Sequence, residues 1–173
     1  ESIVGIVNGT TNFILSSMHE EGVSYSDALR VAQKKGFAEA DPTNDVCGYD
    51  AARKLAILAS IGFRANVTFD DVLVEGIEKI SQKDVQYASE MGYAIKLLAV
   101  GTRQDNGIAL NVYPAFVPRT HPLASVKGSY NAIYVTGNIV DDVMFYGRGA
   151  GSPPTASAVM ADVIPTAKHI MNG

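Results

Sequence analysis

The pattern of hydrophobic and polar positions divides the chain into a helical first half and a strand-rich second half. The β-branched run at residues 2–7 predicts a strand. The segment after it predicts a turn and then a helix, which is capped by Thr10 or Thr11 and stopped by Gly22. The chain therefore opens with a strand, a tight turn and a helix.

Three more helical patterns follow in the first half. A helix is predicted between Ser24 and Gly36, because Ser24 and Asp27 have the spacing of a variant capping box. A long helix is expected from about Asn44 to Gly62. Two further helices are expected to begin near the segments TFDD and SQKD, where a hydroxyl again precedes an acid by three residues.

The sequence pattern changes after Gly92, where β-rich runs are separated by turn signals such as DNG and PRTHP. A final helix is predicted after the segment GRGAG, and Pro165 should end or kink it at Ile164. Helical and strand-like parts of this kind predict an α+β fold. We expect a single layered domain over residues 1–173, with helices on one face of a mixed, largely antiparallel sheet.

Composition narrows the possible functions. The 173 residues are 47% hydrophobic with a net charge of −4, and there is no basic run that would indicate nucleic acid or membrane binding. Cys47 is the only cysteine, and the three histidines are far apart, so neither a disulfide nor a metal site is expected. The cytoplasm is the expected location, with small molecules and proteins as partners. The start at Glu1, directly before an apolar run, suggests a piece of a longer protein.

The stretch AEADPTNDVCGYDAARK, residues 38–54, places four carboxylates beside a lysine at the start of the long helix. Asp50 and Lys54 are four residues apart, so they share one helix face, and the same stripe continues through Ile57, Leu58 and Ile61. We expect this stripe to be buried and Lys54 to point into the interior or a cleft floor. The alternative is an ordinary surface pair worth roughly 0.2–0.5 kcal/mol of helix stability.

The same residues have a possible chemistry. An amine held beside a carboxylate can take a proton from an alcohol or donate a hydrogen bond to a carbonyl. Glu39, Asp41 and Asp45 precede the helix, and several carboxylates at the mouth of a cleft suit the ammonium group of an amino acid. For Asp45, a simple role as an acid near a helix N-terminus remains an equal alternative.

Two glycine turns follow strands and lead into helices, NGTTN near the start and YGRGAGSPPT near the end. Such turns expose backbone N–H groups that can receive an anionic or carbonyl group, although glycine is as often only a requirement of the turn. Gly147, Gly149 and Gly151 follow a G-x-G-x-G pattern, which is not the G-x-G-x-x-G dinucleotide fingerprint. No nucleotide-binding domain is visible in the chain.

Five segments taken in order resemble the catalytic and dimerisation region of the homoserine dehydrogenase family. They are GIVNGTTNFIL, AQKKGFAEADPTNDVCGYDAARKLAIL, EGIEKI, HPLASV followed by NAI, and YGRGAGSPPTASAV. The long second segment is the most specific. Enzymes of this family interconvert L-homoserine and L-aspartate 4-semialdehyde with NAD or NADP, on the route to threonine, methionine and isoleucine.

The resemblance implies roles for the acidic stretch. Lys54 would be the catalytic acid and base, and Asp50 would orient it and contact the substrate. Glu39 and Asp45 would surround the amino and hydroxyl groups of homoserine. The acids would thus receive a cationic amino acid while the lysine acts on the oxygen at its far end.

The resemblance also implies roles for the two glycine turns. Gly9 and Thr10 would lie near the substrate, together with Phe37, which stands where many members have tyrosine. Gly147 and Gly149 would face the nicotinamide of the cofactor.

The family's N-terminal Rossmann domain, with its dinucleotide fingerprint, would precede Glu1, so this chain should not turn over alone. A homodimer formed through the sheet is also implied. A non-catalytic amino-acid-binding or oligomerisation module is the alternative, and a third possibility is a dehydrogenase for another alcohol or semialdehyde.

Overall fold

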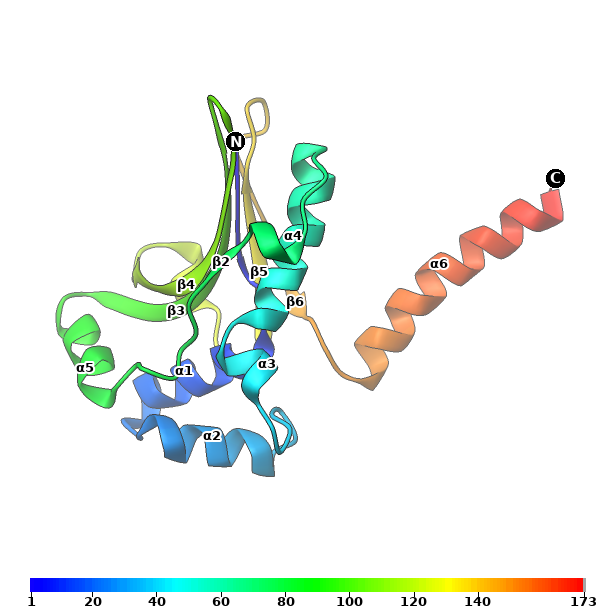
Figure 1. The fold of residues 1–173 in the computed structure, drawn as a ribbon. Coiled ribbons are helices and arrows are strands. Elements are labelled where there is room, and N and C mark those ends of the chain that lie inside the picture. Colours follow the sequence, from blue (N-terminus) through cyan, green and yellow to red (C-terminus); the bar gives the residue numbers. More distant parts are fainter. Residues whose placement is uncertain (173) are drawn as a thin grey trace.

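The structure, a computed structural model, describes residues 1–172 and places helices against one open sheet (Figure 1). The helices are α1 (Gly9–Glu21), α2 (Tyr25–Lys34), α3 (Thr43–Val46), α4 (Tyr49–Phe63), α5 (Gln82–Glu90) and α6 (Ser152–Asn172), with 3-10 turns η1 (Phe69–Asp71) and η2 (Pro122–Ser125). The strands are β1 (Ser2–Ile6), β2 (Leu73–Val74), β3 (Tyr93–Gln104), β4 (Gly107–Pro118), β5 (Tyr130–Thr136) and β6 (Asp142–Arg148).

The six strands form a mixed sheet in the order β2-β4-β3-β1-β5-β6. β3 and β4 form one antiparallel hairpin and β5 and β6 another, and β1 lies antiparallel between β3 and β5. Only the short β2 runs parallel to its neighbour, β4. The expected α+β class with a largely antiparallel sheet is confirmed.

The main core lies between one face of the sheet and the helices, as expected. Ile95, Leu97 and Ala99 of β3 face α1, α4 and α5 across this core, where Ile14 and Leu55 are completely buried. A smaller cluster on the opposite face is closed by η2, whose Leu123 is also completely buried. The helices therefore cover one face of the sheet, and on the other face the short segment η2 covers the smaller cluster.

The first two helices begin and end through local side-chain chemistry. The cap of α1 is Asn8, whose side chain accepts a hydrogen bond from the backbone N–H of Thr11, so the expected cap at Thr10 or Thr11 is wrong by two or three residues. Gly22 ends α1 with a left-handed φ of 68°, as expected. Ser24 caps α2 by accepting from the backbone N–H of Asp27, which agrees with the sequence pattern.

The long helix expected from Asn44 to Gly62 is broken into α3 and α4. Gly48, with φ of 83°, separates the two helices, because a left-handed residue cannot continue a right-handed helix. The segment TFDD forms only the 3-10 turn η1, although its capping box between Thr68 and Asp71 is present. The segment SQKD does begin a helix, α5, with Ser81 as its cap.

The buried face of α4 differs from the expected one. Leu55, Ala59 and Phe63 are buried, whereas Ile57 is 60% and Ile61 73% exposed. The helix packs through small residues, and a Cβ on Gly62 would lie 2.5 Å from the Cδ1 atom of Ile3. This close approach to β1 selects the alanine-rich stripe over the bulkier isoleucine stripe.

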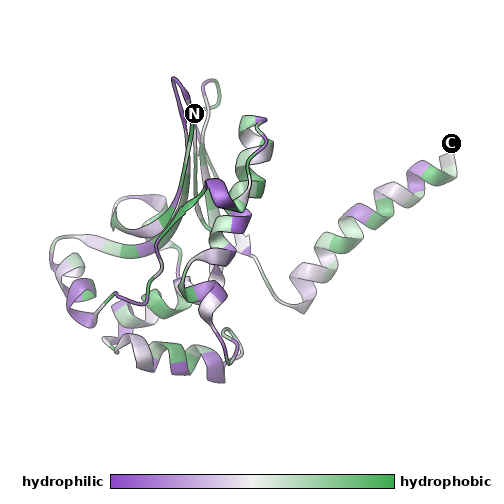
Figure 2. Cartoon of the chain, viewed as in Figure 1, coloured by the Kyte–Doolittle hydropathy of each residue, from purple (hydrophilic) through white to green (hydrophobic). Residues whose placement is uncertain are grey.

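Helix α6 runs from Ser152 to Asn172 and continues past Pro165, so of the two expected effects of this proline, an end or a kink at Ile164, the end is wrong. It projects away from the sheet (Figure 1), and Figure 2 shows apolar residues along its exposed length. The residues around Pro165 are exposed, so water can satisfy the carbonyl that the proline leaves without a donor. In the part of the chain that the structure describes, none of the helices has the length and apolarity needed to cross a membrane.

Candidate active site

The candidate site centres on Asn8, at the start of α1, which links two of the predicted carboxylates. Its Nδ2 atom donates to Oδ1 of Asp45 at 2.7 Å and to Oδ2 of Asp50 at 2.8 Å. Its Oδ1 atom accepts from the backbone N–H of Thr11 at 2.9 Å, and this fixes the orientation of the amide. The cap of α1 therefore also holds Asp45 and Asp50 together.

Lys54 completes this network from α4. Its Nζ atom lies 2.7 Å from Oδ2 of Asp50 and donates to the carbonyl oxygen of Val7 at 3.1 Å. The Lys54 side chain is 47% exposed, so it does not lie in the interior, which was one of the two places expected from the sequence. Its amine is nevertheless fixed beside the first glycine turn, because Val7 directly precedes Asn8 and Gly9.

The other carboxylates of the acidic stretch behave differently. Glu39 is exposed and lies outside the network that joins Asp45, Asp50 and Lys54. Asp41 accepts from the Thr43 hydroxyl and from its backbone N–H, and these two bonds hold the pKa of Asp41 below its usual value. Asp41 therefore serves the turn before α3. Asp45 and Asp50 are the carboxylates that Asn8 links, and Asp50 is the one that contacts Lys54.

The first glycine turn brings Gly9 and Thr10 next to Asn8 and its network. The Thr10 hydroxyl donates to the carbonyl oxygen of Phe37 at 2.6 Å, which ties the segment after α2 to the start of α1. The Phe37 ring packs against Phe13, with 4.9 Å between ring centroids, and borders a hollow of about 480 Å³. Phe37 thus lies next to the network through its backbone, while its ring faces an aromatic surface.

The second glycine turn lies against the first through Asn131. Asn131 is paired with Gly147 across β5 and β6, and its Nδ2 atom donates to the carbonyl oxygen of Val7 at 3.3 Å. A Cβ on Gly149 would lie 2.1 Å from this nitrogen, whereas a Cβ on Gly147 would meet no atom within 4 Å. Gly149 therefore packs on Asn131, and Gly147 borders open space.

The sequence interpretation missed Asn8 and Asn131. Asn8 carried a detectable signal, since asparagine directly before a helical pattern is among the best caps. Asn131 carried none, because its partner Val7 is 124 residues away in the sequence.

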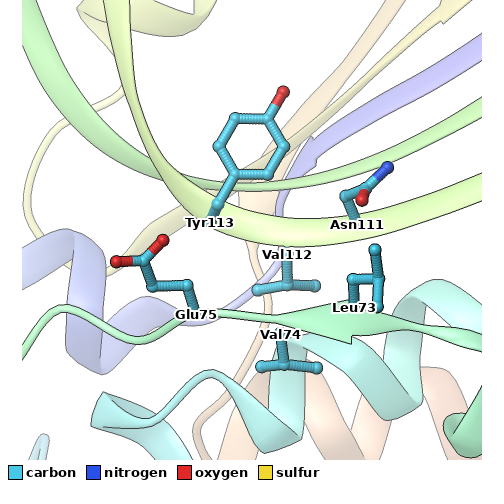
Figure 3. A pocket seen from close by; sticks show the side chains of 6 residues that line it. All are labelled: Leu73, Val74, Glu75, Asn111, Val112 and Tyr113. Carbon is cyan, nitrogen blue, oxygen red and sulfur yellow. The ribbon is translucent and has the colours of Figure 1, made fainter.

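Other concave surfaces do not compete with this network. A hollow of about 340 Å³ between β2 and β4 is lined by Glu75, Asn111 and Tyr113 together with apolar neighbours (Figure 3), and it includes no residue of the network. Within residues 1–172, no group of three or more His, Cys, Asp and Glu side chains is arranged to hold a metal ion.

Comparisons with known proteins agree on one family. The homoserine dehydrogenase family profile matches residues 1–164. Homoserine dehydrogenase from Synechocystis is 52% identical over 168 residues, which are 95% of this chain and 39% of the relative. The Bacillus subtilis enzyme is 48% identical over 171 residues, which are 99% of this chain and 40% of the relative. The chain therefore spans about 40% of the length of these relatives.

Solved structures show the same relationship. The crystal structure of Staphylococcus aureus homoserine dehydrogenase superposes with a TM-score of 0.93 at 44% identity, covering 98% of this chain and 43% of that chain. A hyperthermophilic archaeal homoserine dehydrogenase in complex with NADPH superposes with a TM-score of 0.78 at 30% identity, covering 95% of this chain and 46% of that chain. By sequence and by fold, this chain belongs to the homoserine dehydrogenase family.

Proposed function

We propose that residues 1–173 form the substrate-binding and catalytic domain of an NAD(P)-dependent homoserine dehydrogenase. The reaction is the interconversion of L-homoserine and L-aspartate 4-semialdehyde on the route to threonine, methionine and isoleucine. The observation that supports this proposal is the continuous network from Asp45 through Asn8 and Asp50 to Lys54. It places one amine and two carboxylates around the end of a single strand.

Lys54 is the proposed acid and base. When homoserine is oxidised, the Lys54 amine takes the proton of the substrate's side-chain hydroxyl. In the reverse direction the Lys54 amine returns a proton to the carbonyl oxygen of the semialdehyde. Asp50 and the Val7 carbonyl restrain the amine from two directions, so the flexible lysine chain does not have to be ordered during the reaction. Asp50 acts here through the position of Lys54.

The substrate's ammonium group is proposed to bind on the acidic side of the network. Asp45 already accepts from Asn8 and keeps its second oxygen for another donor. Glu39 precedes Asp45 in the acidic stretch, and its side chain is exposed, so it can approach a bound amino acid. Gly9 and Thr10 would lie against the substrate, with Phe37 held to them through the Thr10 hydroxyl.

The nicotinamide cofactor fits the open space at Gly147. A Cβ there would meet nothing within 4 Å, so the backbone of β6 can be approached closely by a planar ring. When bound, NAD or NADP accepts or supplies the hydride. Gly149 contributes by packing on Asn131, which holds the second glycine turn beside the first. The NADPH complex of the archaeal relative supports a nicotinamide cofactor without fixing the choice between NAD and NADP here.

We also propose that the exposed stripe of α4 faces the nucleotide-binding region implied by the family resemblance. Ile57 and Ile61 lie on the Lys54 side of α4 and are largely exposed, and exposed apolar patches commonly mark interfaces. A homodimer is proposed through the sheet, whose edge strand β6 exposes Phe145 and Tyr146. The unpaired Cys47 supports a reducing location, the cytoplasm.

The test uses the complete protein, meaning this chain joined to the nucleotide-binding region that the family resemblance places before it. The complete protein should oxidise homoserine with NADP or NAD. Lys54→Ala should lower kcat by about 100-fold or more, because the proton acceptor is lost. Lys83→Ala, which removes another exposed lysine on α5, is the matched control. Near-normal activity of Lys54→Ala would contradict the assignment.

Substrate analogues separate this proposal from a non-catalytic amino-acid-binding module. 4-Hydroxybutyrate keeps the hydroxyl and lacks the amine, so its oxidation should be slow mainly through a raised KM. 2-Aminobutyrate keeps the amine and lacks the hydroxyl, so it should inhibit competitively without being oxidised. A binding module would take up both homoserine and 2-aminobutyrate with no turnover and no dependence on nicotinamide nucleotide.

A further inference from the structure

The Val7 carbonyl oxygen receives two side-chain donors, Lys54 Nζ at 3.1 Å and Asn131 Nδ2 at 3.3 Å. Ile6 and Ala132 form the last pair between β1 and β5. Val7, the residue after Ile6, and Asn131, the residue before Ala132 in β5, therefore lie just beyond this pair. The Asn131 side chain bonds Val7 where the backbone ladder has stopped. The position of this carbonyl, and with it one of the two acceptors of Lys54, therefore depends on Asn131.

Asn131 also determines how closely the second glycine turn can approach. A Cβ on Gly149 would lie 2.1 Å from Nδ2 and 2.7 Å from Cγ of Asn131. The φ of Gly149 is not in the left-handed range, so the backbone conformation itself would accept alanine. The Asn131 side chain is what excludes a side chain at position 149.

The Asn131 amide oxygen is buried and has no hydrogen-bond partner among the described residues. The nitrogen must face Val7, because a carbonyl oxygen only accepts, and this leaves Oδ1 in the space between Gly9 and Gly149. An apolar residue of similar size would avoid an unsatisfied buried oxygen. A polar amide at this place is therefore more consistent with a positioning role than with packing alone.

The segment that carries Asn131 is itself held firmly. Asn12 of α1 donates through Nδ2 to the carbonyl oxygens of Val126, Gly128 and Tyr130, at 3.0 to 3.2 Å. The residue directly before Asn131 is thus fixed to the same helix whose cap, Asn8, holds Asp45 and Asp50. Helix α1 therefore positions both Asn131, through Asn12, and the two carboxylates, through Asn8.

We propose that Asn131 is a positioning residue that orients the Lys54 amine through the shared Val7 carbonyl and joins the two glycine turns by filling the space beside Gly149. The catalytic part of this inference rests on the proposed function of Lys54. The structural part, the coupling of Asn131 to Gly149 and to the Lys54 amine, does not.

A double-mutant cycle in the complete protein tests the coupling. Gly149→Ala alone should lower kcat for homoserine by about 10- to 100-fold, because the new methyl group displaces Asn131. In an Asn131→Ala background the same substitution should change kcat by no more than about twofold, since the space is then vacant. Gly147→Ala is the matched control, and its effect should be equal in both backgrounds because its Cβ meets nothing. Equal effects of Gly149→Ala in both backgrounds would overturn the coupling.

Asn131→Asp tests the hydrogen bond without removing volume, since a carboxylate cannot donate to Val7. We expect a kcat lowered by about tenfold or more with the KM for homoserine within about twofold, as for an interaction that orients the reacting group. A melting temperature close to that of the unchanged protein distinguishes this from loss of folded protein. Equal kcat in Asn131→Asp and the unchanged protein would overturn the positioning role.

A measurement on this chain alone separates failure of the inference from failure of the proposed function. The Lys54 ammonium signal in 15N-lysine-labelled chain should shift in Asn131→Asp and stay unchanged in Gly147→Ala. A shift, combined with near-normal activity of Lys54→Ala in the complete protein, would support the positioning of the amine and refute its catalytic role. An unchanged signal in Asn131→Asp would overturn the inference whatever the activity.

Discussion

Two asparagines one turn apart at the start of α1 each organise a lysine, with opposite surroundings. Asn8 donates to Asp45 and Asp50, and Lys54, with its side chain 47% exposed, contacts Asp50. Asn12 instead accepts from Lys96, whose amine also donates to the carbonyl oxygen of Val126 and whose side chain is almost completely buried. One lysine is charge-paired at the surface, and the other is held in the interior by neutral oxygens.

The difference shows how solvent exposure and hydrogen-bond partners give the two lysines different properties. Burial lowers the pKa of Lys96 to about 8, since the charged amine loses its hydration without gaining a carboxylate in contact. Glu20 opposes this shift and Lys127 adds to it, both from a distance. Through its two bonds Lys96 links β3 to α1 and to the loop before β5. Lys54, with its side chain 47% exposed, lies where a ligand can reach it.

The largest effect on stability is expected from Asn12→Ala. The substitution removes one donor from each of three backbone carbonyls, those of Val126, Gly128 and Tyr130, although Val126 keeps the Lys96 amine. It also leaves the Lys96 amine with one acceptor fewer, so the free energy of unfolding should fall by about 3 to 5 kcal/mol. Ser16→Ala, which removes a single bond from the backbone N–H of Gly128, should cost about 1 kcal/mol. Urea unfolding of this chain measures both, and equal losses in the two variants would contradict a central role for Asn12.

The next largest effect is a pH dependence that belongs to Lys96. Its folded pKa of about 8 lies below 10.5, the ordinary pKa of a lysine, so between these pH values the unfolded chain binds more protons than the folded chain. Stability from this group should therefore be lowest below pH 8 and rise by up to about 3 kcal/mol toward pH 10.5. The rise should be missing in Lys96→Met, which serves as the reference for all other titrating groups. Parallel pH curves for the two proteins would refute this account of Lys96.

A smaller loss is expected from Asn8→Ala. The variant removes the cap of α1 and the only described donor between Asp45 and Asp50, so stability should fall by about 1 to 2 kcal/mol. Asn8→Ser keeps a capping oxygen and should recover most of that loss. Thermal unfolding of the two variants separates the cap from the link between carboxylates, and an equal loss in both would show that the link dominates.

The smallest effect should come from Lys54→Met. A half-exposed ion pair contributes little, so the free energy of unfolding should change by less than about 1 kcal/mol and the change should shrink at high salt. The same variant is expected to abolish most activity of the complete protein. A large loss of stability in the chain alone would mean that Lys54 is structural, like Lys96, and would remove the contrast between the two networks.

The parts of the fold that were predicted correctly depend on neighbours in the sequence. The caps at Ser24 and Ser81 and the stop at Gly22 rest on contacts a few residues apart. The β-rich runs after Gly92 were predicted from the residue types of each run and the turn signals between them. The Asp50 and Lys54 pair was found for the same reason, since residues four apart meet on any helix. The family resemblance added roles for these residues that spacing alone could not give.

The features that were missed or predicted wrongly were decided by packing between distant segments. The sequence of α4 is apolar on more than one side, so only the close approach of Gly62 to Ile3 selected its buried stripe and left Lys54 exposed. Asn8 joins residues 37 and 42 positions away, and Asn131 reaches Val7 across 124. The sequence by itself determined the local helices, turns and strands and the pairing of Asp50 with Lys54. Tertiary structure alone decided the other oxygens around each lysine, the Val7 carbonyl at Lys54 and the oxygens of Asn12 and Val126 at Lys96, because they come from distant segments that only folding brings together.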